Sequence, residues 1–165
     1  HSLQVHSADL RIIELPDGSA AMESFVVSPR FGRAPDVALL RQDLVRALDG
    51  TLSLDEALAA KERDYGETPA PATGLPEAEP KVLWFEDEAT GAVILELRTA
   101  DRIGLLHRVA TALESNGVSV RWARIATLGN SVVDSFCLTP LVEGPPMLSA
   151  QTRELLERAV LSAAG

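Results

Sequence analysis

The 165-residue sequence predicts an α+β fold that contains two related units. Three observations lead to this prediction. Segments with strand-like alternation are interspersed with segments of helical periodicity. Part of the second half repeats part of the first at a nearly constant spacing. A segment with four prolines and few large apolar residues, 66–80, separates the halves and is expected to be an extended linker.

The first half predicts a hairpin followed by two helices. Loose apolar alternation over 3–15 and 20–28 indicates two strands, and the Pro-Asp-Gly-Ser between them favours a tight turn. Residues 37–50 have helical periodicity and end at a glycine, while 53–65 begin with a Ser-x-x-Glu capping box. The face of the first helix that we expect to be buried carries Leu40, Leu44, Ala47 and Leu48.

The second half predicts the order strand, helix, strand, strand, helix, with one short strand before it. A phase slip near Ala123 predicts a β-bulge, Asn116-Gly117 predicts a helix stop, and Gly129-Asn130 predicts a tight turn. The continuous apolar run in 91–100 favours a central strand. The expected elements are strands 81–88, 91–100, 118–128 and 131–139, a helix after residue 104 and a helix over 149–163. The helix residues expected to face the core are Leu105, Leu106, Val109, Ala110, Leu113, Leu155, Leu156, Ala159 and Val160.

This order is a ferredoxin-like βαββαβ unit that lacks its last strand. The first half repeats the hairpin and the last helix: residues 5–8 lie over 120–123 at an offset of 115, and 22–25 over 133–136 at an offset of 111. The first unit is therefore expected to be incomplete at its N-terminus. The predicted domains are 1–65, the end of a first unit plus an extra helix, then the linker 66–80, and the second unit 81–165; the strand near 82–85 could belong to either unit.

Composition and motifs restrict the function. The net charge of −9 and the pI of about 4.8 argue against binding to nucleic acid or to an anionic membrane. The single cysteine, Cys137, is expected to be buried, and with no long apolar segment the chain is expected to be cytoplasmic. No phosphate-binding, dinucleotide-binding or nucleophile motif occurs, and His1, His6 and His107 are scattered, so we expect no catalytic and no metal-binding residues.

The segment DRIGLL, residues 101–106, is the strongest candidate for a ligand site. Asp101 is expected to cap the helix that follows. Gly104 has no side chain, so a backbone or a ligand can approach it closely. The N–H groups at a helix start favour a carboxylate. The segment therefore predicts either ordinary helix capping or a turn that holds a small acid.

Two acidic residues recur at equivalent places in the two repeats. Glu23 and Asp134 each precede a Ser-Phe pair, and strand parity puts each on the same side as that phenylalanine. Either could pair with an arginine such as Arg11 or Arg124. We expect a structural role for both carboxylates.

DRIGLL, the amphipathic helix after it, Gly-Val-x-Val and the Val-Val-Asp-x-Phe strand resemble an ACT domain, a small regulatory module that binds amino acids. More narrowly, 95–139 resembles the second of the two C-terminal ACT domains of PII uridylyltransferase/uridylyl-removing enzymes, and VHSADLRI…FVV resembles the end of the first. The resemblance covers nearly all of the chain outside the linker. It implies a glutamine-sensing region without catalytic residues, in an enzyme that adds uridylyl or adenylyl to the PII signal protein and removes it.

The resemblance also implies a ligand site and partners. The family usually has a proline where this chain has Ile103, which is expected to loosen the turn. Glutamine is the implied allosteric ligand, Mg²⁺ is implied only for the complete enzyme, and ACT–ACT pairing in a homodimer is implied as well. The implied site consists of Asp101, Arg102, Ile103, Gly104, Leu105 and Leu106, closed by Asn116, Gly117, Val118 and Val120 of a neighbouring unit.

Two other functions fit the same residues. The chain could be a stand-alone ACT protein or the ACT region of an amino-acid biosynthetic enzyme. It could also be a dimerisation module that binds no ligand, in which DRIGLL is only a helix start. A ligand response that depends on Gly104 separates the sensing functions from the structural one.

Overall fold

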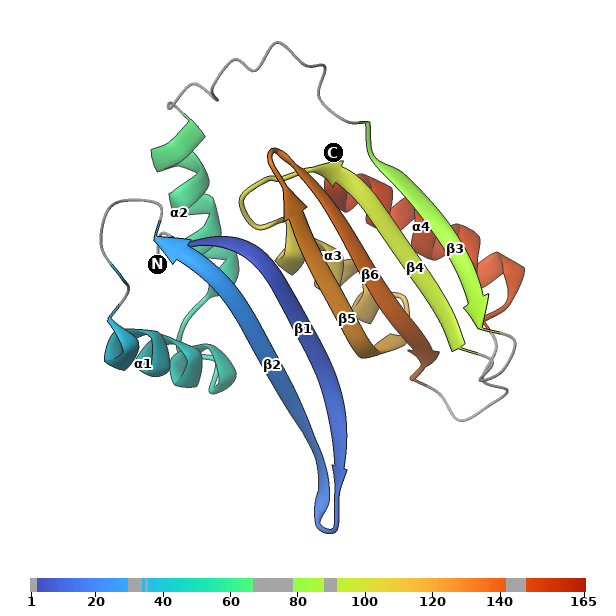
Figure 1. The fold of residues 1–165 in the computed structure, drawn as a ribbon, viewed down its shortest axis with the longest axis horizontal. Helices are drawn as coiled ribbons and strands as arrows, with labels where there is room; N and C mark the ends of the chain where they lie inside the picture. Colours follow the sequence, from blue (N-terminus) through green and yellow to red (C-terminus); the bar gives the residue numbers. More distant parts are fainter. Residues whose placement is uncertain (1–2, 30–33, 35, 67–78, 88–91, 142–147) are drawn as a thin grey trace. The chain divides into compact units, whose positions relative to one another are not determined.

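The computed structural model describes residues 3–29, 34, 36–66, 79–87, 92–141 and 148–165. It confirms the α+β class, with a six-stranded sheet in the order β2-β1-β5-β6-β4-β3 (Figure 1). Most of the predicted linker lies outside the described residues. The strands are β1 (Leu3–Leu15), β2 (Gly18–Pro29), β3 (Lys81–Asp87), β4 (Ala92–Ala100), β5 (Val118–Leu128) and β6 (Ser131–Pro140), and the helices are α1 (Val37–Leu48), α2 (Leu54–Gly66), α3 (Leu105–Ser115) and α4 (Ala150–Ala164).

The chain divides into two compact units. Val5–Val26 and Glu77–Gly165 form the unit that contains most of the sheet, and His1–Gln4 and Val27–Pro76 form the other. Within the first of these, β5 pairs with β1 and β6, and β4 pairs with β6 and β3, all antiparallel. The predicted central position of β4 is therefore confirmed.

The short strand β3 pairs along its length with β4 and lies at the edge of the sheet. A ferredoxin-like unit places its last strand antiparallel beside its first. Here β4 is the first strand of the βαββα order, so β3 occupies the place of the last strand although it comes earlier in the sequence. The sequence left open which unit this strand belongs to. In the described residues, β3 pairs with β4 and so belongs to the sheet of the second half.

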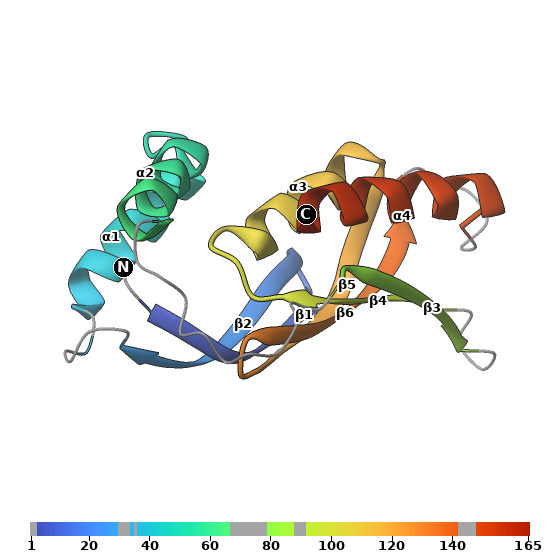
Figure 2. The same cartoon turned by 90° about the horizontal axis from the view of Figure 1, so that it is seen from above.

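Helices α3 and α4 lie on the same face of the sheet (Figure 2). The buried residues repeat every four positions in each helix, so only a narrow stripe faces the sheet. The prediction that Leu106, Ala110 and Leu155 face the core was wrong, because each lies one position outside its stripe and is exposed. The buried helix residues are Leu105, Val109, Leu113, Leu156, Val160 and Ala164.

The predicted β-bulge is present in β5, slightly earlier than the phase slip indicated. The pairing of β5 with β6 shifts register between Val120 and Trp122. After the shift, Ala123 and Ile125 join Val118 on the face that packs against the helices. No described helix of the chain is both long and apolar enough to cross a membrane. Cys137 is buried, as predicted.

The two sequence repeats meet at the pairing of β1 with β5. The offset of 115 makes Arg124 the repeat equivalent of Asp9, and these two residues lie opposite each other in the ladder. On either side of this pair, each β1 residue lies opposite the repeat equivalent of its own neighbour across Asp9: Ala8 pairs with Ile125, and Leu10 pairs with Ala123. Exchanging the two repeats therefore leaves the pairing unchanged, so β1 and β5 are related by a local two-fold axis at this position. The paired residues are Ser7 and Ala126, Ala8 and Ile125, Asp9 and Arg124, Leu10 and Ala123, and Arg11 and Trp122.

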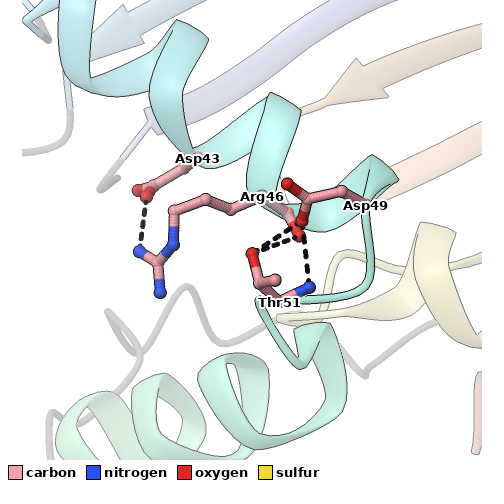
Figure 3. Close-up of polar contacts among 4 residues, drawn as sticks. All are labelled: Asp43, Arg46, Asp49 and Thr51. Atoms are coloured by element: carbon pink, nitrogen blue, oxygen red, sulfur yellow. Dashed lines mark hydrogen bonds and ion pairs between the residues drawn. The ribbon is translucent and has the colours of Figure 1, made fainter.

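The corner between α1 and α2 is fixed by local hydrogen bonds (Figure 3). The Asp49 carboxylate accepts hydrogen bonds from the backbone N–H of Thr51 at 3.0 Å and from its hydroxyl at 2.6 Å. Arg46 forms an ion pair with Asp43 at 3.2 Å. The predicted cap of α2 is confirmed at Ser53, whose hydroxyl accepts a hydrogen bond from the third helical N–H at 3.3 Å.

Helix α1 forms where the sequence predicts it, but its apolar face is not covered. None of its residues is buried, and Leu44 and Leu48 are 60% and 79% exposed. Leu40 and Ala47 are half-buried. The prediction of a buried face was therefore wrong for the described part of the chain, because helical periodicity identifies a face without identifying what packs against it.

Candidate functional site

The candidate ligand segment lies between β4 and α3, and we refer to residues 101–104 as the β4–α3 turn. Gly104 has a φ of 73°, in the left-handed region, and no side chain caps the helix there. The prediction that Asp101 caps α3 was wrong, because the helix begins only at Leu105 and the chain needs the intervening residues to turn. The backbone N–H of Asp101 instead donates to the carbonyl of Asn130 at 2.8 Å.

Two arginines tie the β4–α3 turn to the end of α4. Arg108 donates from Nε to the carbonyl of Ala163 at 2.9 Å and from Nη1 to that of Ile103 at 2.8 Å. Arg102 donates to the carbonyl of Gly165. The last carbonyl groups of a helix lack partners within the helix and favour cations. The turn is thus held from both sides by α3 and α4.

Only some of the backbone N–H groups in and next to the β4–α3 turn donate a hydrogen bond to another backbone group. The backbone N–H of Leu105 donates to the carbonyl of Arg102 at 3.1 Å. Among the described residues, the structure records no backbone acceptor for the backbone N–H of Ile103 or Gly104. Two donors next to a helix start are a suitable arrangement for one carboxylate.

The remaining predicted site residues lie at the other end of α3. This helix has 11 residues, so its ends are about 16 Å apart. Gly117 has a φ of 73° and confirms the predicted helix stop, and the side chain of Asn116 donates to the carbonyl of Ala112 at 2.7 Å. Val118 is buried, and Val120 is half-buried. One unit therefore does not bring this group together with the β4–α3 turn.

Asp134 is the most unusual polar residue of this region. It is 2% exposed, and its Oδ1 has no hydrogen-bond partner among the residues that the structure describes. Burial raises the pKa of Asp134 to about 7; a hydrogen bond from the backbone of Ala126 lowers this pKa, and the negative charge of Asp101 raises it. We did not predict a ligand role for this residue. The sequence did contain a signal for it: Asp134 is two positions from Phe136, so both side chains lie on the same, core-facing side of β6.

The predicted pairing of Asp134 with an arginine was wrong. Arg11 forms its ion pair with Asp9 at 2.7 Å. Arg124 alternates with the buried Ile125 on β5, so it lies on the opposite face of the sheet from Asp134. Alternation along the strand correctly predicted which face of the sheet carries the Asp134 carboxyl group. It did not predict that Arg124 lies on the opposite face.

A hollow of about 340 Å³ lies elsewhere, over β1, β2 and β5. Most of its lining residues alternate with the buried Ala8 and Ile125, which puts the hollow on the face away from α3 and α4. It contains no residue of the β4–α3 turn, and its only charged residues are Asp9 and Arg124. We regard the turn as the better candidate, because two of its backbone N–H groups have no recorded backbone acceptor and the negative charge of its first residue, Asp101, acts on the buried carboxyl group of Asp134. The hollow is lined by Ser7, Ala8, Asp9, Ser24, Val26, Arg124, Ile125 and Ala126.

Substitution of Gly104 tests the backbone of the turn. Gly104→Ala is expected to lower the free energy of unfolding by roughly 1 to 2 kcal/mol, because an L residue is strained at a φ of 73°. Gly50→Ala, at a φ of 74° in the α1–α2 corner, has the same backbone cost and open space around its Cβ. Urea unfolding followed by circular dichroism measures both variants. An unchanged stability of Gly104→Ala would show that the turn does not hold this conformation.

The fold and the site together define an α+β domain with a ferredoxin-like strand order and a candidate small-ligand site at a strand-to-helix turn. The chain is 40% identical over 89% of its length to the bifunctional uridylyltransferase/uridylyl-removing enzyme of Streptomyces coelicolor. Enzymes with the same name from Mycobacterium tuberculosis and Rhodospirillum rubrum are 35% and 30% identical over 84% and 94% of the chain. The chain spans only 17%, 18% and 17% of the length of these relatives. No protein-family model and no solved structure matched.

Proposed function

We propose that the chain is a regulatory, glutamine-sensing region of a PII-protein nucleotidyltransferase. The observation that carries this proposal is the similarity to uridylyltransferase/uridylyl-removing enzymes over 84–94% of the chain, together with the β4–α3 turn that falls within it. We propose that the carboxylate of glutamine binds the backbone N–H groups of Ile103 and Gly104. A proline at position 103 would lack one of these donors, so Ile103 adds a hydrogen-bond donor even though it constrains the turn less.

The second wall of the site is proposed to come from the first repeat of the same chain. The offset of 115 makes Val5 the equivalent of Val120. Strand β1 lies beside β5 within one chain, and Val5 is partly buried against the core of the second half. This supports closure of the site between two repeats of one chain. Pairing with a second chain as a homodimer remains compatible with the same arrangement.

The regulatory consequence is a change in the balance of two activities. In the complete enzyme, we propose that glutamine favours one arrangement of the ACT units and thereby biases the catalytic domains between nucleotide transfer to the PII signal protein and its removal. Mg²⁺ and PII would be bound by those catalytic domains. The coupling requires that glutamine bind the two arrangements with different affinity.

Calorimetry with glutamine tests the proposal directly. Titration of the 165-residue chain is expected to give saturable heat at millimolar glutamine or below, and asparagine and glutamate serve as comparison ligands. Gly104→Ala is expected to weaken binding about tenfold or more, because the strained turn displaces the two amide donors. Gly50→Ala, which has the same backbone cost, is expected to bind as the unmodified chain does. Absence of heat at millimolar glutamine would contradict the proposal.

A second candidate function is association without a ligand. It is favoured by apolar side chains that remain exposed on both faces of the β1–β2 hairpin, because exposed apolar surface can mark an interaction site. In that case Gly104→Ala lowers stability without any change in a glutamine response. The exposed side chains are Ile12 (40%), Ile13 (38%), Met22 (52%), Phe25 (49%) and Val26 (59%).

A further inference from the structure

Asp134 interrupts the apolar face of the sheet that α3 and α4 cover. Its register neighbours are Leu97 on β4 and Ile125 on β5, both buried. In the part of the chain that the structure describes, the only other buried polar residue is Thr99. Thr99 follows Leu97 by two positions on β4 and therefore points to the same face. Thr99 lies two positions before Asp101, where the β4–α3 turn begins, and Asp134 lies opposite Leu97, two positions further from the turn.

The described residues give Asp134 little compensation for its burial. Only a hydrogen bond from the backbone of Ala126 favours its ionised form, whereas Asp101 adds a second negative charge. Arg124 lies on the other face, and the guanidinium of Arg108 is bonded to carbonyl groups of the turn and of α4. A buried carboxyl without a counter-charge destabilises a fold. A residue that costs stability in this way is expected to have a role in function.

Three of the four carbonyl groups of the β4–α3 turn already accept hydrogen bonds. The carbonyl of Arg102 accepts from Leu105 at 3.1 Å, and that of Gly104 accepts from the backbone N–H of Arg108 at 2.9 Å. The carbonyl of Ile103 accepts from the Arg108 guanidinium at 2.8 Å. An ammonium group bound at the turn would compete with each of these bonds. An ionised carboxylate is the stronger acceptor for it.

We propose that Asp134, together with Asp101, binds the α-ammonium group of the amino acid whose carboxylate lies at the N–H groups of the β4–α3 turn. The inference rests on the proposed function above and adds the group that recognises the amine. An ammonium group gives Asp134 Oδ1 the partner that it lacks and supplies the missing positive charge. The site therefore selects α-amino acids and rejects acids of the same length that lack the amine.

Two ligands and two variants test this inference. The ligands are glutamine and 4-carbamoylbutanoate, which is glutamine without its α-amino group. The variants are Asp134→Asn and Glu23→Gln, which make the same change at repeat-equivalent positions, one buried and one exposed. Calorimetry on the unmodified chain and on both variants measures the affinity of each protein for each ligand, and thermal melting confirms that both variants fold.

The unmodified chain and Glu23→Gln are expected to bind glutamine about 10 to 100 times more tightly than the des-amino acid, the effect of one charge-assisted hydrogen bond. In Asp134→Asn this preference is expected to disappear, with glutamine weakened and the des-amino acid unaffected. If Asp134→Asn retains the preference, the inference is wrong while the proposed function stands. If the unmodified chain binds no glutamine, the proposed function is wrong, and the inference falls with it.

Discussion

Leu156→Ala is expected to destabilise the unit that contains α4 by about 2 to 5 kcal/mol, the usual cost of truncating a fully buried leucine. Leu156 is 0% exposed and belongs to the stripe of α4 that faces the sheet. Leu155 precedes it and is 46% exposed. Leu155→Ala is therefore the matched control and is expected to change stability by less than about 1 kcal/mol.

Tryptophan fluorescence during urea unfolding isolates this effect. Both tryptophans of the chain, Trp84 and Trp122, lie in the unit that contains α4. The indole N–H of Trp84 donates to Glu157 on α4 at 3.1 Å, so its emission reports on the docking of this helix. Equal losses of stability in Leu155→Ala and Leu156→Ala would contradict the assigned face of α4.

Asp134→Asn is expected to stabilise the chain, and increasingly so as the pH rises. Burial raises the pKa of folded Asp134 to about 7, whereas its ordinary value in an unfolded chain is 3.8. Between these values the folded state keeps a proton that the unfolded state has lost. The stability of the unmodified chain therefore falls as the pH rises through this range. The asparagine variant has no such proton, so its advantage is expected to grow by about 2 kcal/mol between pH 5 and pH 8.

Melting curves of both proteins at several pH values measure this difference, with Glu23→Gln as the exposed control. The melting temperature of Asp134→Asn should exceed that of the unmodified chain at pH 8, and the two should converge toward pH 5. A variant that is less stable at pH 8 would mean that the Asp134 carboxylate has a strong partner in the folded state. That result would remove the energetic argument for its role in binding.

The sequence was sufficient to predict where most elements form, because each has a local cause. The hairpin turn, the Ser53 cap of α2 and the left-handed Gly117 are signals contained in a few residues, and the structure confirms them. The phase slip near Ala123 likewise has a local cause in the β5 bulge. What periodicity could not provide was the width of each buried face, because this depends on how α3 and α4 share the sheet.

The candidate site was predicted only in part. The glycine turn is visible in the sequence, but the position of the helix N-cap, at Gly104 rather than at Asp101 three residues earlier, depends on where β4 ends. Asp134 lies 33 positions from Asp101, and their electrostatic coupling arises only once β4 and β6 pair. The place of β3 beside β4 is also a long-range pairing, which explains why the sequence left it open.

The central claim is that the β4–α3 turn binds glutamine through its backbone N–H groups. Amide chemical shifts of the ¹⁵N-labelled chain, recorded during a glutamine titration, test it at the level of single residues. The account predicts saturable shifts at the amides of Ile103, Gly104 and Leu105, with no comparable change in the α1–α2 corner. Saturable shifts confined to other residues, or no shift at millimolar glutamine, would contradict it.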